Sequence, residues 1–315
     1  MKCLSVVLCV VLSGAGAAQA CDLCAVYTAT EAKEVRPGWS VGVFEQFTHF
    51  GTLRENGDEV PDAVGQRLDS SITQLIVGYQ FNNRLGVQFN LPVIYRSFRR
   101  PEGFAIDTGH ESGIGDASLT ANVTVFQRFT EDTTIVVNVL GGLKFPTGRS
   151  DRLAEELNEI EVPGAPESGV HGHDLALGSG STDGIIGGSV LARWKRLFAS
   201  AALQYAIRSE GDFDYRYAND LTWNGGPGVY VWLSHTGTAT LQFNVSGESK
   251  GTDTFQGAAA EDTGITAVYL GPEVSVTWRD RLNADVGIDL PVVQNNTAVQ
   301  IVPDYRIRAA MTWRF

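Results

Sequence analysis

Apolar and polar residues alternate one by one along most of the chain, and helical spacing is nearly absent. The C-terminal segment is the clearest example, and its apolar side chains share one face: Tyr305, Ile307, Ala309, Met311, Trp313 and Phe315. The opposite face carries Asp304, Arg306, Arg308, Ala310, Thr312 and Arg314. In a soluble sandwich the apolar face would pack on a second sheet, whereas in a membrane barrel it faces lipid and the arginines face a wet interior.

Segments with this alternation are long enough to cross a bilayer as tilted strands, which takes about nine to eleven residues each. We predict strands at residues 39–50, 68–81, 84–98, 115–128, 133–146, 182–194, 197–209, 222–234, 238–249, 264–278, 281–293 and 299–315. The connections between them alternate between two lengths. The short ones lie at 82–83, 130–132, 195–196, 235–237 and 279–280, and the long ones at 51–67, 99–114, 147–181, 210–221, 250–263 and 294–298.

This segregation of loop length is typical of outer-membrane barrels, which have short periplasmic turns and longer extracellular loops. The sequence therefore predicts an all-β fold over residues 39–315, a transmembrane antiparallel up-and-down β-barrel of about twelve strands. The expected location is the outer membrane of a Gram-negative-type bacterium. Pro92 and Pro291 interrupt apolar strands, and because proline cannot donate to a strand ladder, both are expected at bulges or near the outer rim.

The first twenty residues differ from the rest. Lys2 precedes a short apolar run, and Ala18-Gln19-Ala20 provides an A-x-A cleavage pattern, so residues 1–20 are predicted to be a secretory signal peptide. No later run is long and apolar enough for a transmembrane helix. Residues 21–38 are then a periplasmic N-terminal segment that carries a CxxC motif.

The charge balance limits the partners. The formal net charge is −12 and no basic stripe is present, so nucleic acid is not expected as a partner. Outer-membrane lipid is the expected environment. The C-terminal strand, with Trp313 and Phe315, is the expected insertion signal for the barrel-assembly machinery. No cofactor is predicted.

Cys21 and Cys24 are the sharpest local feature, and several chemistries remain open for them. Covalent haem attachment would need a histidine directly after the second cysteine, where Ala25 stands, so it is excluded. A disulfide is favoured in the oxidising periplasm. A metal site, a lipid anchor on Cys21 and a redox-active thiol pair are the alternatives, and the segment could also enter the barrel interior.

The longest loop, 147–181, is acidic and contains His171, His173 and Asp174. Carboxylates together with imidazoles could bind a divalent cation. The simpler interpretation, which we favour, is a solvated acidic loop. A short helix around residues 152–157 could fold inward and constrict the pore.

Charged residues of both signs fall on the predicted inner face. They are Arg96, Lys144, Arg193, Arg208, Glu273, Asp285, Asp289, Arg306, Arg308 and Arg314. Charged linings tune selectivity in pores, so a channel for passive diffusion of a small solute is the predicted function. The alternative is a closed structural or interaction barrel whose loops or CxxC segment carry the function. No histidine sits in a nucleophile motif, so an enzyme is not predicted.

Three short motifs occur in order: Ser112–Leu119, Gly142–Gly148 and Leu177–Asp183. From the residues alone, the motifs are predicted to shape the backbone at the rim. Their glycines allow two chain segments to approach closely, and Asp116 accepts hydrogen bonds from backbone N–H groups. Together they resemble the outer-membrane channel-like proteins associated with meta-pathway phenol degradation, over roughly residues 68–315. The resemblance implies a transporter-like barrel and a solute that is hydrophobic or aromatic. The cysteine-bearing N-terminus is not part of this pattern.

Overall fold

The computed structural model describes residues 37–157 and 162–315. The predicted signal peptide and the Cys21–Cys24 motif lie outside these residues. The twelve strands of the barrel are β1 (Gly38–Glu55), β3 (Arg67–Gln80), β4 (Leu85–Glu102), β6 (Ser118–Phe129), β7 (Thr133–Lys144), β8 (Asp183–Trp194), β9 (Leu197–Ile207), β11 (Asp220–Ser234), β12 (Gly237–Lys250), β15 (Ile265–Trp278), β16 (Leu282–Asn296) and β17 (Val299–Arg314). The remaining elements are β2 (Asp58–Glu59), β5 (Ala105–Ile114), β10 (Tyr215–Arg216), β13 (Asp253–Phe255), β14 (Ala258–Ala260), η2 (Asp151–Leu157), α1 (Gly172–Leu175), η3 (Asp212–Asp214) and η4 (Glu261–Thr263).

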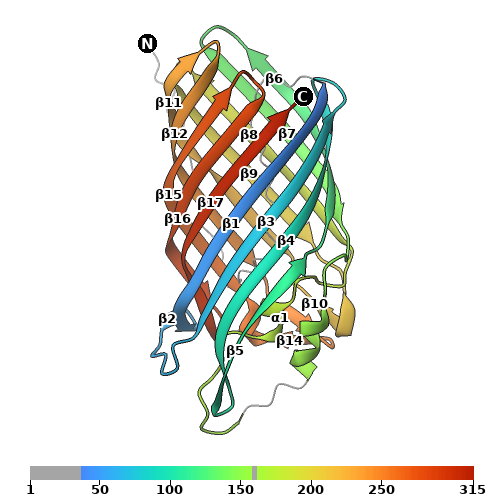
Figure 1. Ribbon diagram of the computed structural model, residues 1–315, viewed down its shortest axis with the longest axis vertical. Coiled ribbons are helices and arrows are strands. Elements are labelled where there is room, and N and C mark those ends of the chain that lie inside the picture. The colour runs from blue at the N-terminus through green and yellow to red at the C-terminus, as the bar shows by residue number, and fades with distance from the viewer. Residues whose placement is uncertain (1–36, 158–161) are drawn as a thin grey trace, which may run out of the picture.

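Each barrel strand pairs antiparallel with the next one along the chain, and β1 pairs with β17 to close the cylinder (Figure 1). The closing register runs from Ser40 opposite Arg314 to Glu55 opposite Val299. The predicted fold class and strand number are therefore confirmed. None of the helices in the described part of the chain has the length and apolar character needed to cross a membrane.

The two faces of the wall follow the sequence alternation. Along β1, Val41 and Val43 are exposed on the outside, whereas Phe44, Gln46 and Thr48 are buried on the inside. Large apolar side chains are exposed around the whole outer surface, among them Leu75, Phe89, Leu119, Leu143, Ile186, Leu203, Phe243, Val274, Leu290 and Met311. A closed barrel is one of the two structures that satisfy every backbone hydrogen bond in lipid. This closed, apolar-surfaced wall is built for an outer membrane.

Both prolines lie where the ladder is interrupted, as predicted. Pro92 sits where β4 changes partner, from β6 up to Asn90 to β5 beginning at Val93. Pro291 lies at a β-bulge in the β15–β16 ladder, opposite Tyr269. In each case the missing proline N–H falls at a break that the ladder already contains.

The predicted loop 99–114 is wrong in one respect, because most of it is strand. β4 continues to Glu102 and turns at Gly103, which has a φ of 58°, into β5. The resulting hairpin leaves the barrel and ends in Phe104, which is 75% exposed (Figure 1). One face of β5 is exposed and the other is half-buried, and neither face forms an apolar stripe that would have marked the strand in the sequence.

Candidate functional site

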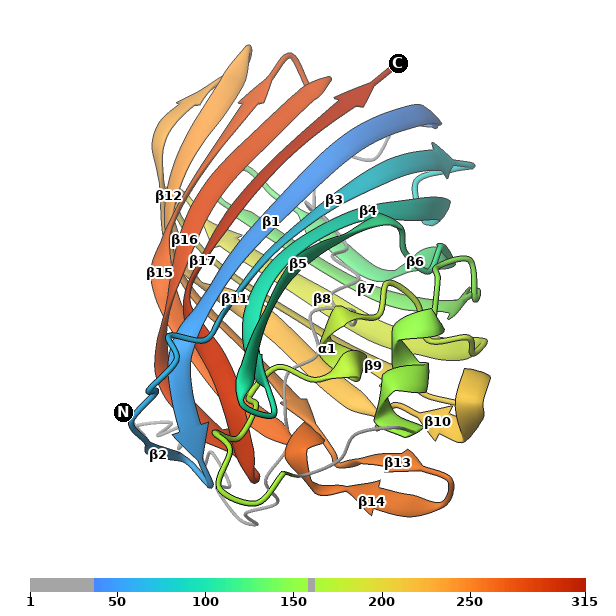
Figure 2. The same ribbon diagram turned by 60° about the horizontal axis from the view of Figure 1, so that its bottom comes forward.

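The extracellular mouth of the barrel is occupied by the segment between β7 and β8. We call its described residues, 145–157 and 162–182, the inward loop. Figure 2 shows this end brought forward, with α1 lying between β5 and β9. Val170 and Leu175 of the inward loop are fully buried against four wall residues that face the interior. These wall residues are Phe50, Leu68, Phe98 and Ile301.

This burial corrects the interpretation of the acidic loop as a solvated one. Leu153, Val170, Leu175 and Ala176 are fully buried, and His173 is 4% exposed. Each large apolar side chain taken out of water contributes roughly 1.5–3 kcal/mol. A short helix does form at Asp151–Leu157, where Leu153 packs on Ala176, Tyr215 and Tyr217. That this helix constricts a pore stays a prediction.

Arg96 of β4 ties the inward loop to the wall. Its side chain is 1% exposed, and its guanidinium donates to the backbone carbonyls of Asp174 and Ala176, the second at 3.1 Å. From the other side, the hydroxyl of Tyr217 donates to the carbonyl of His173 at 3.1 Å. The carbonyls around α1 are thus satisfied by wall and neighbouring-loop side chains rather than by water.

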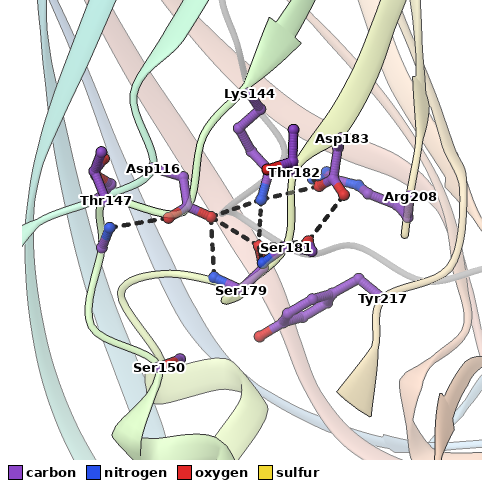
Figure 3. Close-up of polar contacts among 12 residues, drawn as sticks. Asp116, Lys144, Thr147, Ser150, Ser179, Ser181, Thr182, Asp183, Arg208 and Tyr217 are labelled. Atoms are coloured by element: carbon purple, nitrogen blue, oxygen red, sulfur yellow. Dashed lines mark hydrogen bonds and ion pairs between the residues drawn. The ribbon is translucent and has the colours of Figure 1, made fainter. Parts of the chain in front are cut away.

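A buried ion-pair network holds the base of the inward loop (Figure 3). Lys144 at the end of β7 lies 2.6 Å from Asp116 and 2.9 Å from Asp183, and its ammonium also contacts the hydroxyl of Ser179. Arg208 pairs with Asp183 at 2.8 Å and with Asp220 at 2.7 Å. We call these residues the Lys144 cluster. Because the charges are buried and paired, removal of any one of them leaves its partners uncompensated.

Asp116 joins the loop backbone to this cluster. Its carboxylate accepts the backbone N–H of Gly148 at 3.0 Å and of Ser179 at 2.9 Å, which connects the outgoing and returning arms of the loop. The arms cross at Gly148 and Gly178, where a Cβ on either glycine would lie within 2.6 Å of backbone atoms of the other arm. Only glycine permits this approach. The three sequence motifs therefore meet in space as one structural unit, and Asp116 accepts backbone N–H groups as predicted.

A second group of charges lies on the inner face of β12, β15, β16 and β17, which we call the charged wall. Arg308 contacts Asp289 at 2.8 Å and Glu273 at 3.2 Å. Arg306 pairs with Glu248 at 2.5 Å and lies 4.2 Å above the ring of Tyr269. Positive and negative side chains alternate here and neutralise one another. The charged wall therefore presents ion pairs to the interior rather than a ring of like charges.

The inner face of β3, β4, β6, β7, β8 and β9, which we call the neutral wall, carries amides and hydroxyls together with buried aliphatic side chains such as Ile72, Ile76 and Ile94. Asn90 donates to Gln74 at 2.8 Å. Asn138 accepts from Thr124 at 2.8 Å and donates to Ser189 at 3.2 Å. The interior is thus lined by two chemically different walls.

None of the ten charged residues assigned to the inner face is fully exposed to solvent. Arg96, Lys144, Arg208, Asp289, Arg306 and Arg308 are buried, and Arg193, Glu273, Asp285 and Arg314 are half-buried. Trp313 and Phe315 are exposed on the outer face. That the ten residues line a conducting path, and that Trp313 and Phe315 act in insertion, stay predictions.

Sequence reasoning missed Asp183 as a member of the site. Lys144 and Asp183 are direct partners in the β7–β8 ladder, at the two ends of the long loop. Pairing the flanking strands from the loop inward would have placed them opposite each other. Asp220 and Ser179 carried no such signal, because their contacts depend on how the loops fold.

His171 and His173 stack with ring centroids 5.6 Å apart. Three acidic side chains surround them: Glu156 lies 3.1 Å and Asp174 3.5 Å from His173, and Asp262 lies 3.2 Å from His171. Burial opposes a charge on His173, but Asp174 and Glu156 outweigh it and hold its pKa well above the usual value. Conversely, burial disfavours the Glu156 carboxylate, but His173 outweighs this and lowers its pKa.

These pairs engage both ring nitrogens of His173 and the Nδ1 of His171. Among the described residues, no three histidine, cysteine or acidic side chains are arranged around a metal-ion position. Cation binding by His171, His173 and Asp174 therefore stays a prediction. The geometry itself is that of charge pairs holding α1 against η2 and η4.

Comparison with known proteins bears on the fold. The chain is similar to an outer membrane channel from Pseudomonas putida F1, with a TM-score of 0.64 and 16% identity over 89% of this chain and 97% of that one. Weaker likenesses include the beta domain of the Bordetella autotransporter BrkA, with a TM-score of 0.46 and 9% identity over 89% and 100%. Another is CymD, a monoaromatic hydrocarbon channel, with a TM-score of 0.39 and 10% identity over 89% of each chain. No protein-family model and no curated protein sequence matches the chain. The first likeness shows that the chain shares the barrel fold of that protein.

Proposed function

We propose that the protein is an outer-membrane channel through which a small solute diffuses passively, with the inward loop forming the narrowest part at the extracellular end. The observation that carries the proposal is the set of charged side chains on the inner face of the closed barrel, which occur in the Lys144 cluster, on the charged wall and, half-buried, at Arg193 and Arg314 near the periplasmic end. A twelve-strand barrel encloses more space than an eight-strand one, whose interior is nearly filled by side chains. A purely structural barrel would have no need for charged side chains along its interior.

Single-channel recording in a planar bilayer tests the proposal. Purified protein is expected to give unitary conductance steps, both with and without residues 21–38. Heat-modifiable migration on a gel confirms that each sample is a folded barrel. Folded protein that gives no steps in either form would favour the closed structural barrel.

We further propose that the protein is cleaved after Ala20, and that Cys21 and Cys24 then form a disulfide in the periplasm. Intact mass of the mature protein separates the alternatives, because a loss of two hydrogen atoms, an added acyl chain and a bound metal differ in mass. Cleavage at another position would contradict the proposal outright.

We also propose that the C-terminal strand, through Trp313 and Phe315, directs assembly into the outer membrane. Both side chains are exposed on the outer face beside β1. Trp313→Ser with deletion of Phe315 is expected to reduce the amount of assembled barrel in membranes. Unchanged assembly would argue against the role.

A further inference from the structure

The periplasmic rim of the barrel is basic, although the chain as a whole is acidic. We use this name for the five periplasmic turns, the two strand residues on either side of each turn, and the periplasmic ends of β1 and β17. Over the whole chain, 36 acidic residues outnumber 24 basic ones. The rim contains three acidic residues, Glu131, Asp132 and Asp280, and eight basic ones: Arg84, Arg128, Arg193, Lys195, Arg196, Arg279, Arg281 and Arg314. An excess of cations is therefore concentrated at one end of the membrane-spanning wall.

These cations differ from those at the extracellular end in having no acidic partner. At the extracellular end, for example, Arg100 pairs with Asp107 at 3.1 Å and with Glu155 at 2.9 Å. Within the described chain, none of the eight basic side chains of the rim lies within ion-pair distance of a carboxylate. Their charge is therefore available to an anion from outside the protein.

Two of the rim cations lie beside tryptophans that face lipid. The ammonium of Lys195 lies 5.3 Å from the centre of the Trp194 ring, and the guanidinium of Arg279 lies 5.9 Å from that of Trp278. Both tryptophans are exposed on the outer face, and Trp278 stacks on the exposed Trp232 with ring centroids 6.1 Å apart. Tryptophans gather where the hydrocarbon of a membrane meets its headgroups. Lys195 and Arg279 therefore lie at the level of the headgroup phosphates.

The backbone at these two cations does not favour their residue types. Lys195 has a φ of 54° and Arg279 a φ of 52°. Tight hairpin turns prefer asparagine, aspartate or glycine where φ is positive, because other side chains crowd the backbone there. The needs of the turns therefore do not explain a lysine and an arginine at these positions.

We propose that the Lys195–Trp194 and Arg279–Trp278 pairs are binding sites for anionic phospholipids of the periplasmic leaflet. In each site the cation contacts the headgroup phosphate, and the exposed indole packs beside the upper part of the acyl chains. Basic residues at a membrane surface attract anionic lipids, and each lysine or arginine adds to the affinity. A soluble anion would use only the cation, so the combination with a lipid-facing ring favours a lipid. The proposal holds whether or not the barrel conducts.

Native mass spectrometry of the full mature protein, purified in detergent, tests the proposal. Dioleoyl phosphatidylglycerol is the anionic probe, and dioleoyl phosphatidylcholine is the zwitterionic probe with the same acyl chains. Phosphatidylglycerol is expected to bind at least about fivefold more tightly. Equal binding of the two lipids would overturn the proposal. Displacement of phosphatidylglycerol by an equal concentration of inorganic phosphate would also overturn it, because the sites would then take a free anion.

Asparagine substitutions at the two cations sharpen the test. Lys195→Asn and Arg279→Asn remove the charge and suit the positive φ of each turn, so both variants are expected to fold. Each is expected to weaken phosphatidylglycerol binding at its own site about fivefold, the contribution of one basic residue, and to leave phosphatidylcholine binding unchanged. Arg216→Asn is the matched control, because Arg216 is exposed on β10 at the extracellular end.

Heat-modifiable gel migration verifies folding of all three variants. An equal loss of phosphatidylglycerol binding in Arg216→Asn would overturn the assignment to the periplasmic rim. Unchanged binding in a folded protein that carries both Lys195→Asn and Arg279→Asn would do the same.

Discussion

The two ends of the barrel are built in opposite ways. At the extracellular end, the inward loop packs Val170 and Leu175 against the wall and is fastened by the Lys144 cluster. At the periplasmic end the strands are joined by tight turns, such as Lys195–Arg196 between β8 and β9, and no described segment folds back into the interior there. The difference shows that one long loop can obstruct one end of the alternating wall, whereas the tight turns at the other end contribute no such segment among the described residues. In the proposed channel, the described chain therefore narrows the passage at the extracellular end.

Removal of the inward loop is expected to have the largest effect. Replacing residues 149–177 with a short Gly-Ser linker should increase unitary conductance at least about threefold, because an unobstructed twelve-strand barrel approaches a water-filled pore. Planar-bilayer recording provides the measurement. Shortening the exposed β4–β5 hairpin around Phe104 is the control and should leave conductance unchanged. Equal conductance after loop removal would show that the narrowest part lies elsewhere.

Lys144→Met is expected to have the next largest effect. It leaves the carboxylates of Asp116 and Asp183 buried with one fewer counter-charge, and breaking a buried pair costs about 3–5 kcal/mol. The inward loop should detach part of the time, visible as excess open-channel noise and a lower midpoint of heat-induced unfolding on gels. Arg193→Met is the matched control at the periplasmic end, where Arg193 donates to the neutral hydroxyl of Thr134. If the two substitutions have equal effects, the Lys144 cluster has no special part in fastening the loop.

Alkaline pH should also loosen the inward loop, with a smaller effect on conductance than Lys144→Met. Because the pKa of His173 is raised in the folded loop, its stabilisation is complete below the ordinary imidazole pKa of about 6.5 and is lost as pH rises through the raised value. Glu156 and Asp174 have lowered pKa values, so their contribution is complete above their ordinary range and disappears only in strong acid. Conductance should therefore be constant around neutral pH and increase on the alkaline side. His173→Gln should remove this increase, and its persistence in the variant would exclude His173 as the cause.

A change at the periplasmic end should have the smallest effect. Two extra glycines in the Lys195–Arg196 turn lengthen an exposed connection, and such insertions cost only about 0.6 kcal/mol or less. Neither conductance nor the midpoint of unfolding should change measurably. A large change in conductance would mean that the periplasmic turns also restrict passage.

The wall could be predicted from sequence because every crossing strand shows its two faces in adjacent residues. The alternation predicts which face of each strand contacts lipid, as in Val41, Gly42 and Val43 or in Trp313 and Arg314. The β5 strand could not be found this way, since a hairpin outside the membrane has no apolar face to display. His173 and Asp174 were visible as candidates, but their burial depends on Leu175 reaching Phe98, a contact between distant segments. The Lys144–Asp183 pair likewise bridges the ends of a long loop, and alternation within either strand carries no trace of it.

The seam between β1 and β17 has a consequence for how the protein is made. It joins the first strand to the last, and the hydroxyl of Thr52 donates to Asp304, 252 residues later, at 2.7 Å. Until β17 pairs with it, β1 keeps a free edge, and unpaired edges with apolar faces promote aggregation. Contacts this distant in sequence form slowly. Closure therefore requires the two ends of the barrel sequence to meet, and an unclosed chain leaves edges that can pair with other copies.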